Sequence, residues 1–312
     1  IRTPRVEQAF RAVPRHLFLP GVDRQIVYRD DAIPTKRLKS GEPISSSSQP
    51  AIMAIMLEQL ALEPGQRVLE IGAGTGYNAA LMTYLVGETG RVVALDIDDD
   101  IVDAARAHLQ AAGFRQTQVV CADGGFGYPP AAPYDRIILT ASAWDIAPAW
   151  REQLKLGGRL VLPLSLVGLG LLQQSVAFDQ LGSHLASVSV KVCGFMPLRG
   201  AAAAQQPVVT LGAEPGLAIM TTHGHDLDAA AAYHWLTGPA HDQPTGLEVT
   251  THELWLGLVF WLALRERDCC TVMASGEWLK RNAAPDPPEL FSWPEQGRST
   301  NGLISADGGS PT

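Results

Sequence analysis

The fold is decided by the stretch Val68-Leu69-Glu70-Ile71-Gly72-Ala73-Gly74-Thr75-Gly76, in which an apolar run meets three alternating glycines. The apolar run predicts a short buried strand over residues 67–71, and the residues from Tyr77 to Val86 predict a helix. Glycine lets the chain turn sharply between the two and leaves backbone amides open at the helix N-terminus, where a ligand can lie. The stretch therefore predicts a strand, a turn and a helix that together bind a nucleotide-like ligand.

Strands and helices alternate along the chain around this unit. A helix is predicted over residues 50–62, where Met53, Met56, Leu57 and Leu60 recur at helical spacing as a core stripe. Beyond Gly158, the pattern predicts an antiparallel hairpin. The predicted fold class is α/β, a doubly wound, mostly parallel, Rossmann-like sheet that finishes with antiparallel strands. The further predicted segments are strands at 91–97, 119–123, 135–140 and 159–163, a helix at 99–112, and a hairpin of 171–178 with 184–193 around a turn at 179–183.

The length of 312 residues predicts more than one structural unit. Four alanines and two glutamines at 201–206 are typical of a linker, so we place a domain boundary near Gly200. Residues 1–200 form the predicted main domain, in which 1–50 are an N-terminal cap and substrate loop. Residues 201–284 form a smaller α/β extension, for which we expect a role in substrate recognition. Within it, 208–211 and 217–220 predict short strands, 251–265 predict an apolar helix that needs covering, and 285–312 predict a low-complexity tail.

Composition and charge disfavour several classes of protein. Hydrophobic residues make up 46% of the chain, and 32 acidic against 24 basic residues give a net charge of -8, so nucleic acid is not an expected partner. The longest apolar run, residues 254–264, is too short to span a bilayer, and no leader-like segment opens the chain. We therefore expect a cytoplasmic protein without a membrane partner. The cysteines lack C-x-x-C spacing and the histidines lack ligand spacing, so we expect no disulfide framework and no metal.

The spacing of the glycines distinguishes between nucleotide ligands. A dinucleotide fingerprint, G-x-G-x-x-G, would need glycine where this chain has Tyr77. Glu70 would also repel an anionic pyrophosphate and suits a cationic amino-acid ligand instead. We therefore assign Glu70, Gly72, Gly74 and Thr75 to a cofactor site.

Two more acidic residues follow the next predicted strands. Asp96 ends the second strand and is placed to accept hydrogen bonds from ribose hydroxyls, with Ile97 beside it. Asp123 and Gly124 end the third strand, where a carboxylate can accept from an adenine amino group and glycine leaves room for the base. All of these residues follow the carboxyl ends of strands, where open α/β sheets bind ligands. Asp98, Asp99 and Asp100 are typical instead of solvated charges at the start of a helix.

Several stretches in the first 200 residues resemble the protein-L-isoaspartate O-methyltransferase family in order and spacing. This resemblance implies S-adenosylmethionine as cofactor, S-adenosylhomocysteine as its product, and a protein or peptide substrate that carries isoaspartate or aspartate. It also implies that Ser48 lies beside both the cofactor sulfonium and the substrate carboxylate. The stretches are Val13-Pro14-Arg15-His16-Leu17-Phe18-Leu19-Pro20, Ser48-Gln49-Pro50, residues 68–77, residues 153–161 and Met196-Pro197-Leu198.

The chain departs from the pattern of the family in two places. The segment 41–50 has four serines before Gln49-Pro50 where the family has a compact Gly-x-x-Ile-Ser-x-Pro, and about a hundred residues follow Leu198. Extended homologues resemble enzymes that methylate an aspartate in a ribosomally made peptide and prime it to form a succinimide. Repair of damaged protein and tailoring of a peptide therefore both stay open.

Two other functions compete with methyl transfer. An NAD(P)-dependent oxidoreductase is disfavoured by Glu70 and Tyr77. A catalytically inactive, peptide-binding homologue is disfavoured because Ser48, Glu70 and Asp96 are all present.

Overall fold

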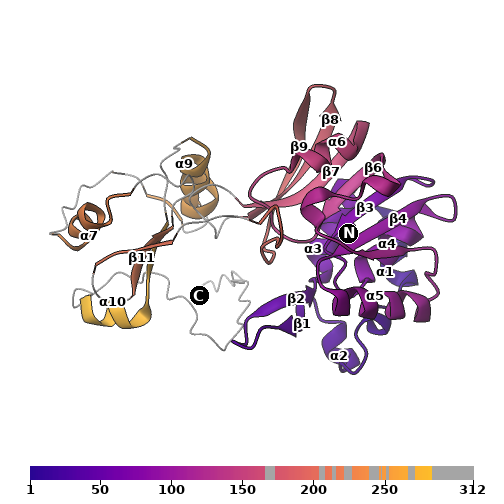
Figure 1. Cartoon of the computed structure of the whole chain (residues 1–312), viewed down its shortest axis with the longest axis horizontal. Helices are drawn as coiled ribbons and strands as arrows, with labels where there is room; N and C mark the ends of the chain where they lie inside the picture. Colours follow the sequence, from indigo (N-terminus) through magenta and orange to yellow (C-terminus); the bar gives the residue numbers. More distant parts are fainter. Residues whose placement is uncertain are drawn as a thin grey trace, which may run out of the picture. The chain divides into compact units, whose positions relative to one another are not determined.

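The computed structural model describes residues 1–165, 173–203, 208–212, 216–220, 227–238, 246, 248–250, 253–265 and 271–282 (Figure 1). The chain divides into two compact units, Ile1–Gln205 with Glu248–Cys269, and Gln206–Leu247 with Cys270–Thr312. The predicted tail at 285–312 lies outside the described residues, as do residues 171 and 172 of the predicted hairpin, 204–206 of the predicted linker, and 251 and 252 of the predicted apolar helix. The functional roles predicted for 1–200 and 201–284 stay predictions.

A seven-stranded sheet forms the centre of the first unit, in the order β5-β4-β3-β6-β7-β8-β9. Strands β5 to β7 in this order are parallel, and β8 and β9 are antiparallel, which confirms the predicted fold class. The winding reverses beside β3, the strand that precedes the glycine turn, and this is the place where such sheets bind ligands. The strands are β3 (Arg67–Ile71), β4 (Arg91–Asp96), β5 (Gln118–Cys121), β6 (Tyr134–Leu139), β7 (Leu154–Ser165), β8 (Gln173–Leu181) and β9 (His184–Cys193).

Alternate residues of each strand face two separate apolar cores. Val68 of β3 packs in one core with residues of α1, α3, α4 and α5, whereas Leu69 and Ile71 pack in the other with Trp150 of α6. The predicted stripe of Met53, Met56, Leu57 and Leu60 is fully buried in the first core, and this part of the prediction is confirmed. The helices are α1 (Pro4–Ala12), α2 (Arg24–Val27), α3 (Pro50–Leu60), α4 (Tyr77–Val86), α5 (Asp99–Ala111) and α6 (Pro148–Gln153), with short 3-10 turns η1 (Arg15–Phe18), η2 (Gly124–Phe126) and η3 (Pro129–Ala131).

The terminal hairpin is longer than the sequence pattern predicts. Strand β7 begins at Leu154 rather than at residue 159, and only Gly182 and Ser183 separate β8 from β9. Asp179, predicted in the turn, lies within β8, where both carboxylate oxygens accept hydrogen bonds from Arg159 of β7. Gly182 has a φ of +69°, which suits a two-residue turn. Pairing between the strands therefore makes them longer than the local residue pattern predicts.

The N-terminal region holds a second feature that the pattern did not predict. Strands β1 (Ile33–Arg37) and β2 (Pro43–Ser47) pair as an antiparallel hairpin. Because Ser45 to Ser47 lie within β2, these serines are part of a strand and not of a flexible loop.

The second unit is a small α/β structure, as predicted. Three antiparallel strands in the order β10-β11-β12 form a sheet, and a core that includes Leu211, Leu217 and Ile219 lies between this sheet and side chains of α7 and α10. The apolar segment η4 (Leu254–Val259, π-helical) and α9 (Phe260–Arg265) group with the first unit. Trp261 of α9 is 52% exposed, and the Arg265 guanidinium lies over its ring at 6.0 Å. In the described part of the chain, no helix is long and apolar enough to cross a membrane. The elements of the second unit are β10 (Val208–Thr210), β11 (Leu217–Met220), β12 (Thr271–Ala274), α7 (Ala229–Thr237) and α10 (Gly276–Asn282).

Candidate active site

The glycine turn between β3 and α4 lies against the ends of the two neighbouring strands. Gly72 has a φ of +104°, and a Cβ there would lie 2.5 Å from Thr140 Oγ1 at the end of β6. The backbone N–H of Gly72 donates to Leu95 O at the end of β4, and that of Gly74 donates to Asp96 Oδ2 at 3.0 Å. Both the backbone conformation and the close approach of Thr140 require glycine at position 72. The turn therefore joins the carboxyl ends of β3, β4 and β6 into one wall.

Glu70 is a wholly buried carboxylate beside this turn. Its Oε1 accepts a hydrogen bond from Asn78 Nδ2 of α4 at 2.7 Å, and among the described residues its Oε2 has no partner. Burial raises the pKa of Glu70 to about 8, the bond from Asn78 opposes the rise, and the charge of Asp96 adds to it. A buried oxygen without a partner costs free energy that a cationic donor would recover. Glu70 can thus receive a ligand ammonium group.

Asp96 lies at the end of β4 and is bonded by backbone groups. Its Oδ1 accepts from the N–H groups of Ile97 at 2.9 Å and Asp98 at 3.5 Å, and its Oδ2 accepts from the N–H of Gly74. Because Oδ2 accepts only one bond from the residues that the structure describes and the bond from Asp98 to Oδ1 is long, Asp96 can still accept hydrogen bonds from hydroxyl groups. Burial raises the pKa of Asp96, and its backbone hydrogen bonds oppose the rise. Thr75 is buried at the tip of the turn, where its carbonyl is 3.0 Å from His108 Nδ1.

Asp123 and Gly124 have structural partners in the protein. Asp123 Oδ1 accepts from the N–H of Gly125 at the start of η2, and its Oδ2 accepts from the N–H of Ala201 at 2.7 Å. A Cβ on Gly124 would lie 2.3 Å from Ile71 Cγ2, so close packing explains this glycine. The role of both residues in binding an adenine ring stays a prediction.

The serine segment, residues 45–48, lies over the glycine turn. Ser45 and Ser47 of β2 are buried, whereas Ser46 and Ser48 are half-buried, as alternation along a strand dictates. Ser46 O lies 3.5 Å from the place where a Cβ on Gly74 would stand, which brings this segment directly to the turn. Ser48 Oγ forms no hydrogen bond within the described part of the chain, so it is available to a ligand.

Arg15 fixes the position of this segment, a role that sequence reasoning missed. The side chain is 2% exposed and donates to carbonyl groups from two separate stretches of chain. The only sequence signal was the family-like stretch that contains Pro14 and Arg15. The acceptors are Val27 O at 2.7 Å, Arg29 O at 3.2 Å, Asp31 O at 3.2 Å, Ser47 O and Oγ at 3.4 Å, and Ser48 O at 2.9 Å.

A cluster of ion pairs joins three segments beside Asp96. Asp98 pairs with Lys36 of β1 and with Arg199, each at 2.9 Å, and Lys36 also pairs with Asp100 at 2.6 Å. The prediction of a solvated charge is therefore wrong for Asp98, whose side chain is only 20% exposed. The partners come from residues 62 and 101 positions away, which no local pattern reveals. The segment that carries Arg199 also supplies the N–H of Ala201 to Asp123, so it extends along the ends of β4 and β5.

The Glu70 oxygen, which is unpaired among the described residues, lies where the winding of the sheet reverses, and it suits a cationic nucleoside better than a dinucleotide. This combination of fold and site is the one expected of a Rossmann-like methyltransferase. The family model for "Protein-L-isoaspartate(D-aspartate) O-methyltransferase (PCMT)" matches residues 1–203. The chain belongs to this family. Among the described residues, no group of three or more His, Cys, Asp or Glu side chains could hold a metal ion.

Individual relatives are similar over the same region. Protein-L-isoaspartate O-methyltransferase 1 of Archaeoglobus fulgidus is 43% identical over 160 residues, which are 51% of this chain and 71% of that protein. The Methanopyrus kandleri enzyme of the same name is 44% identical over 165 residues, 53% of this chain and 70% of that protein.

Solved structures agree with the fold. One protein-L-isoaspartate O-methyltransferase has a TM-score of 0.60 and 28% identity, covering 70% of this chain and 80% of its own. A putative enzyme of this kind from Plasmodium falciparum, in complex with S-adenosyl-L-homocysteine, has a TM-score of 0.55 and 17% identity, covering 64% and 92%. The second likeness concerns the fold alone. Neither an oxidoreductase nor an inactive peptide-binding protein finds support in these comparisons.

Proposed function

We propose that this protein transfers the methyl group of S-adenosylmethionine to the free carboxylate of an isoaspartyl or aspartyl residue in a protein or peptide. Membership of the family supports methyl transfer and this cofactor. The observation that carries the proposal is the Glu70 carboxylate, which is buried beside the glycine turn with one oxygen left without a partner among the described residues.

The residues around the turn fit this cofactor. Glu70 Oε2 would accept from its ammonium group, and Asp96 would accept from its ribose hydroxyls. Gly72, Gly74 and Thr75 would line its path, with Ile97, Asp123 and Gly124 around the adenine ring. When bound, the cofactor supplies an electrophilic methyl group on a cationic sulfur.

The acceptor needs positioning more than it needs a base. The free carboxyl of either residue has a pKa of about 4 and is ionised at neutral pH, so no residue has to remove a proton. Ser48 Oγ would donate a hydrogen bond to one carboxylate oxygen and so aim the other at the methyl group. Arg15 holds the carbonyl of Ser48 at 2.9 Å and thereby sets where this hydroxyl lies.

The fate of the product separates repair from tailoring. The methyl ester would be attacked by the next backbone amide nitrogen, with loss of methanol, to give a succinimide. In repair, hydrolysis of that ring restores a proportion of normal aspartate. In tailoring, the peptide keeps the succinimide or reacts further at it. The hundred or so residues beyond the matched region are our candidate for the part that selects between such substrates.

A direct test offers the purified protein an isoaspartyl peptide, its aspartyl twin and an asparaginyl control, with S-adenosylmethionine. We expect one of the two acids to gain the mass of a methyl ester and then to lose methanol, and the asparaginyl peptide to stay unchanged. If neither acid is methylated at any pH between 6 and 9 while S-adenosylhomocysteine binds, the proposed acceptor is wrong.

A further inference from the structure

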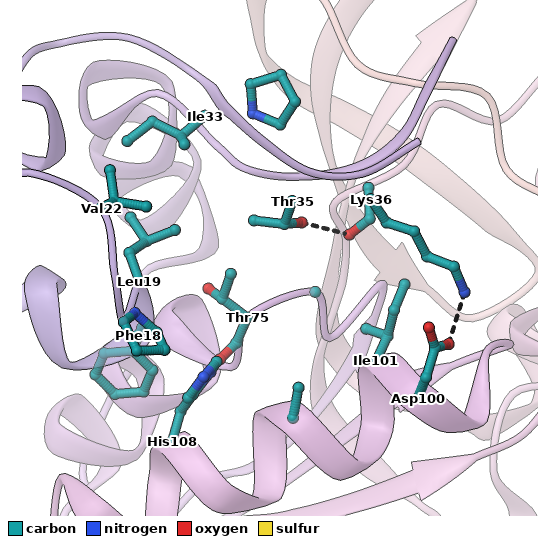
Figure 2. Close-up of a pocket in the computed structure, with 15 residues that line it drawn as sticks. Phe18, Leu19, Val22, Ile33, Thr35, Lys36, Thr75, Asp100, Ile101 and His108 are labelled. Atoms are coloured by element: carbon teal, nitrogen blue, oxygen red, sulfur yellow. Dashed lines mark hydrogen bonds and ion pairs between the residues drawn. The ribbon is translucent and has the colours of Figure 1, made fainter. Parts of the chain in front are cut away.

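A cavity of about 360 Å³ opens beside the glycine turn, between strand β1 and helix α5 (Figure 2). Gly74 and Thr75 of the turn form part of its wall, and Ser45 of β2 forms another part. Glu70, Asp96 and Asp123, to which we assign cofactor contacts, do not line it. Most of the remaining wall is apolar and comes from Phe18, Leu19, Val22, Ile33, Ile101 and Ala104.

The polar side chains of the wall largely bond to one another. Thr35 Oγ1 donates to Ser45 Oγ at 3.2 Å. Figure 2 shows Lys36 paired with Asp100 at one end of the cavity. His108 Nδ1 lies 3.0 Å from the carbonyl of Thr75. A polar ligand would have to compete with these bonds, whereas an apolar group would only displace water from apolar walls. The wall therefore suits an apolar occupant.

The position of the cavity relates it to the acceptor. Ser45 lines the cavity, and β2 leads from Ser45 to Ser47, the residue directly before Ser48. Three residues of extended chain span about 10 Å. A peptide that places its acid at Ser48 and runs extended beside β2 would bring a side chain two or three residues away to the mouth of the cavity.

We propose that this cavity is a subsite for an apolar side chain of the substrate, such as leucine, located two or three residues from the methylated acid. The inference rests on the proposed function, because it takes the acid to lie at Ser48. It deepens that function by naming the substrate class, which is peptides with a large apolar residue at one fixed distance from the acceptor.

The test measures the binding of fluorescent peptides to the protein saturated with S-adenosylhomocysteine. A parent peptide has isoaspartate among alanines, and one leucine is moved through the four positions on each side. At one position two or three residues from the acid, we expect leucine to tighten binding at least about tenfold, or about 1.4 kcal/mol. Equal affinity at all positions, or a gain only next to the acid, would overturn the inference.

Two variants test whether the cavity causes the preference. Ala104→Phe fills the cavity from α5, and we expect the gain from leucine to fall below about twofold. Ala107→Phe adds the same ring at an exposed site on the same helix, outside the cavity wall, and should keep the full gain. A preference that survives in Ala104→Phe, or a tenfold loss of S-adenosylhomocysteine affinity in that variant alone, would contradict a side-chain subsite.

Because binding is read without turnover, the two proposals can fail separately. A leucine preference that Ala104→Phe removes, in a protein that forms no ester, would sink the proposed function and leave the subsite. Ester formation without any positional preference for leucine would support the proposed function and overturn the subsite. Binding and ester formation are also measured on the aspartyl version of the peptide that binds most tightly.

Discussion

Glu70 and Asp98 lie at the ends of neighbouring strands, and these two carboxylates differ in their burial and in their charged partners. Glu70 is buried with one oxygen unpaired among the described residues, and burial raises its pKa to about 8. Asp98 is paired with Arg199 and Lys36, and these bonds hold its pKa below the usual range. A carboxylate whose charge is matched inside the protein has a structural role, whereas one left unmatched is ready for an external cation.

The largest effect is expected for Glu70→Gln. The amide keeps the size of the side chain but removes the charge that meets the cofactor ammonium, so S-adenosylhomocysteine should bind roughly 100-fold more weakly. Titration calorimetry measures this, with Asp98→Asn as the matched control. We expect the control to bind within about threefold of the parent, and equal losses in the two variants would remove the distinction between them.

Ser48→Ala should lower the rate of methyl transfer and leave the affinity for the cofactor unchanged. Without the hydroxyl donor, the acceptor carboxylate is less well aimed, and we expect kcat to fall about 30-fold with S-adenosylhomocysteine affinity unchanged. Ser40→Ala, in the exposed turn between β1 and β2, is the control and should leave both quantities at parent values. Parent turnover in Ser48→Ala would exclude Ser48 from the mechanism.

Arg15→Lys tests whether the serine segment must be held. A lysine keeps the charge but lacks the planar fork that serves carbonyls from two stretches of chain, so we expect kcat to fall about tenfold with little change in cofactor affinity. Arg11→Met removes an exposed arginine of α1 and should be neutral. If Arg15→Lys lowers only the melting temperature and leaves kcat intact, the arginine stabilises the fold without positioning Ser48.

The two carboxylates should also change the stability of the fold with pH, and their effects have opposite signs. A raised folded-state pKa means that folded Glu70 retains a proton that the unfolded chain loses, so the free energy of unfolding should fall as pH rises from about 4.5 to 8. Asp98, with a lowered pKa, should stabilise the fold above its unfolded pKa and lose this as pH falls through the folded pKa.

Chemical denaturation at several pH values separates the two groups. Relative to the parent, Glu70→Gln should gain roughly 3 kcal/mol between pH 5 and pH 8, because each pH unit over which folded Glu70 retains its proton costs the parent about 1.4 kcal/mol. Asp98→Asn should lose about 0.5 kcal/mol at pH 7 and nothing near pH 2. Parallel pH profiles for parent and Glu70→Gln would show that Glu70 is not buried in an unmatched state.

The two sides of the site also differ in how far the sequence predicts them. Strand β3, the glycine turn and α4 form one continuous stretch, and the predicted bounds of both elements match the structure. The hairpin of β1 and β2, the reach of Arg15 and the pairing of Asp98 with Arg199 depend on contacts between distant segments. Local residue patterns reveal periodicity and turns, but they do not reveal which far segment supplies a partner. For the same reason Asp123 was predicted without its bond to Ala201.

The central claim is that the unpaired oxygen of Glu70 receives the ammonium group of the cofactor. Calorimetry of S-adenosylhomocysteine binding at pH 7, repeated in buffers of different ionisation enthalpy, counts the protons exchanged on binding. With a pKa of about 8 before binding, Glu70 should release close to one proton as it ionises against the ammonium, and Glu70→Gln should release about one proton fewer than the parent. The same proton count in both proteins would contradict the account.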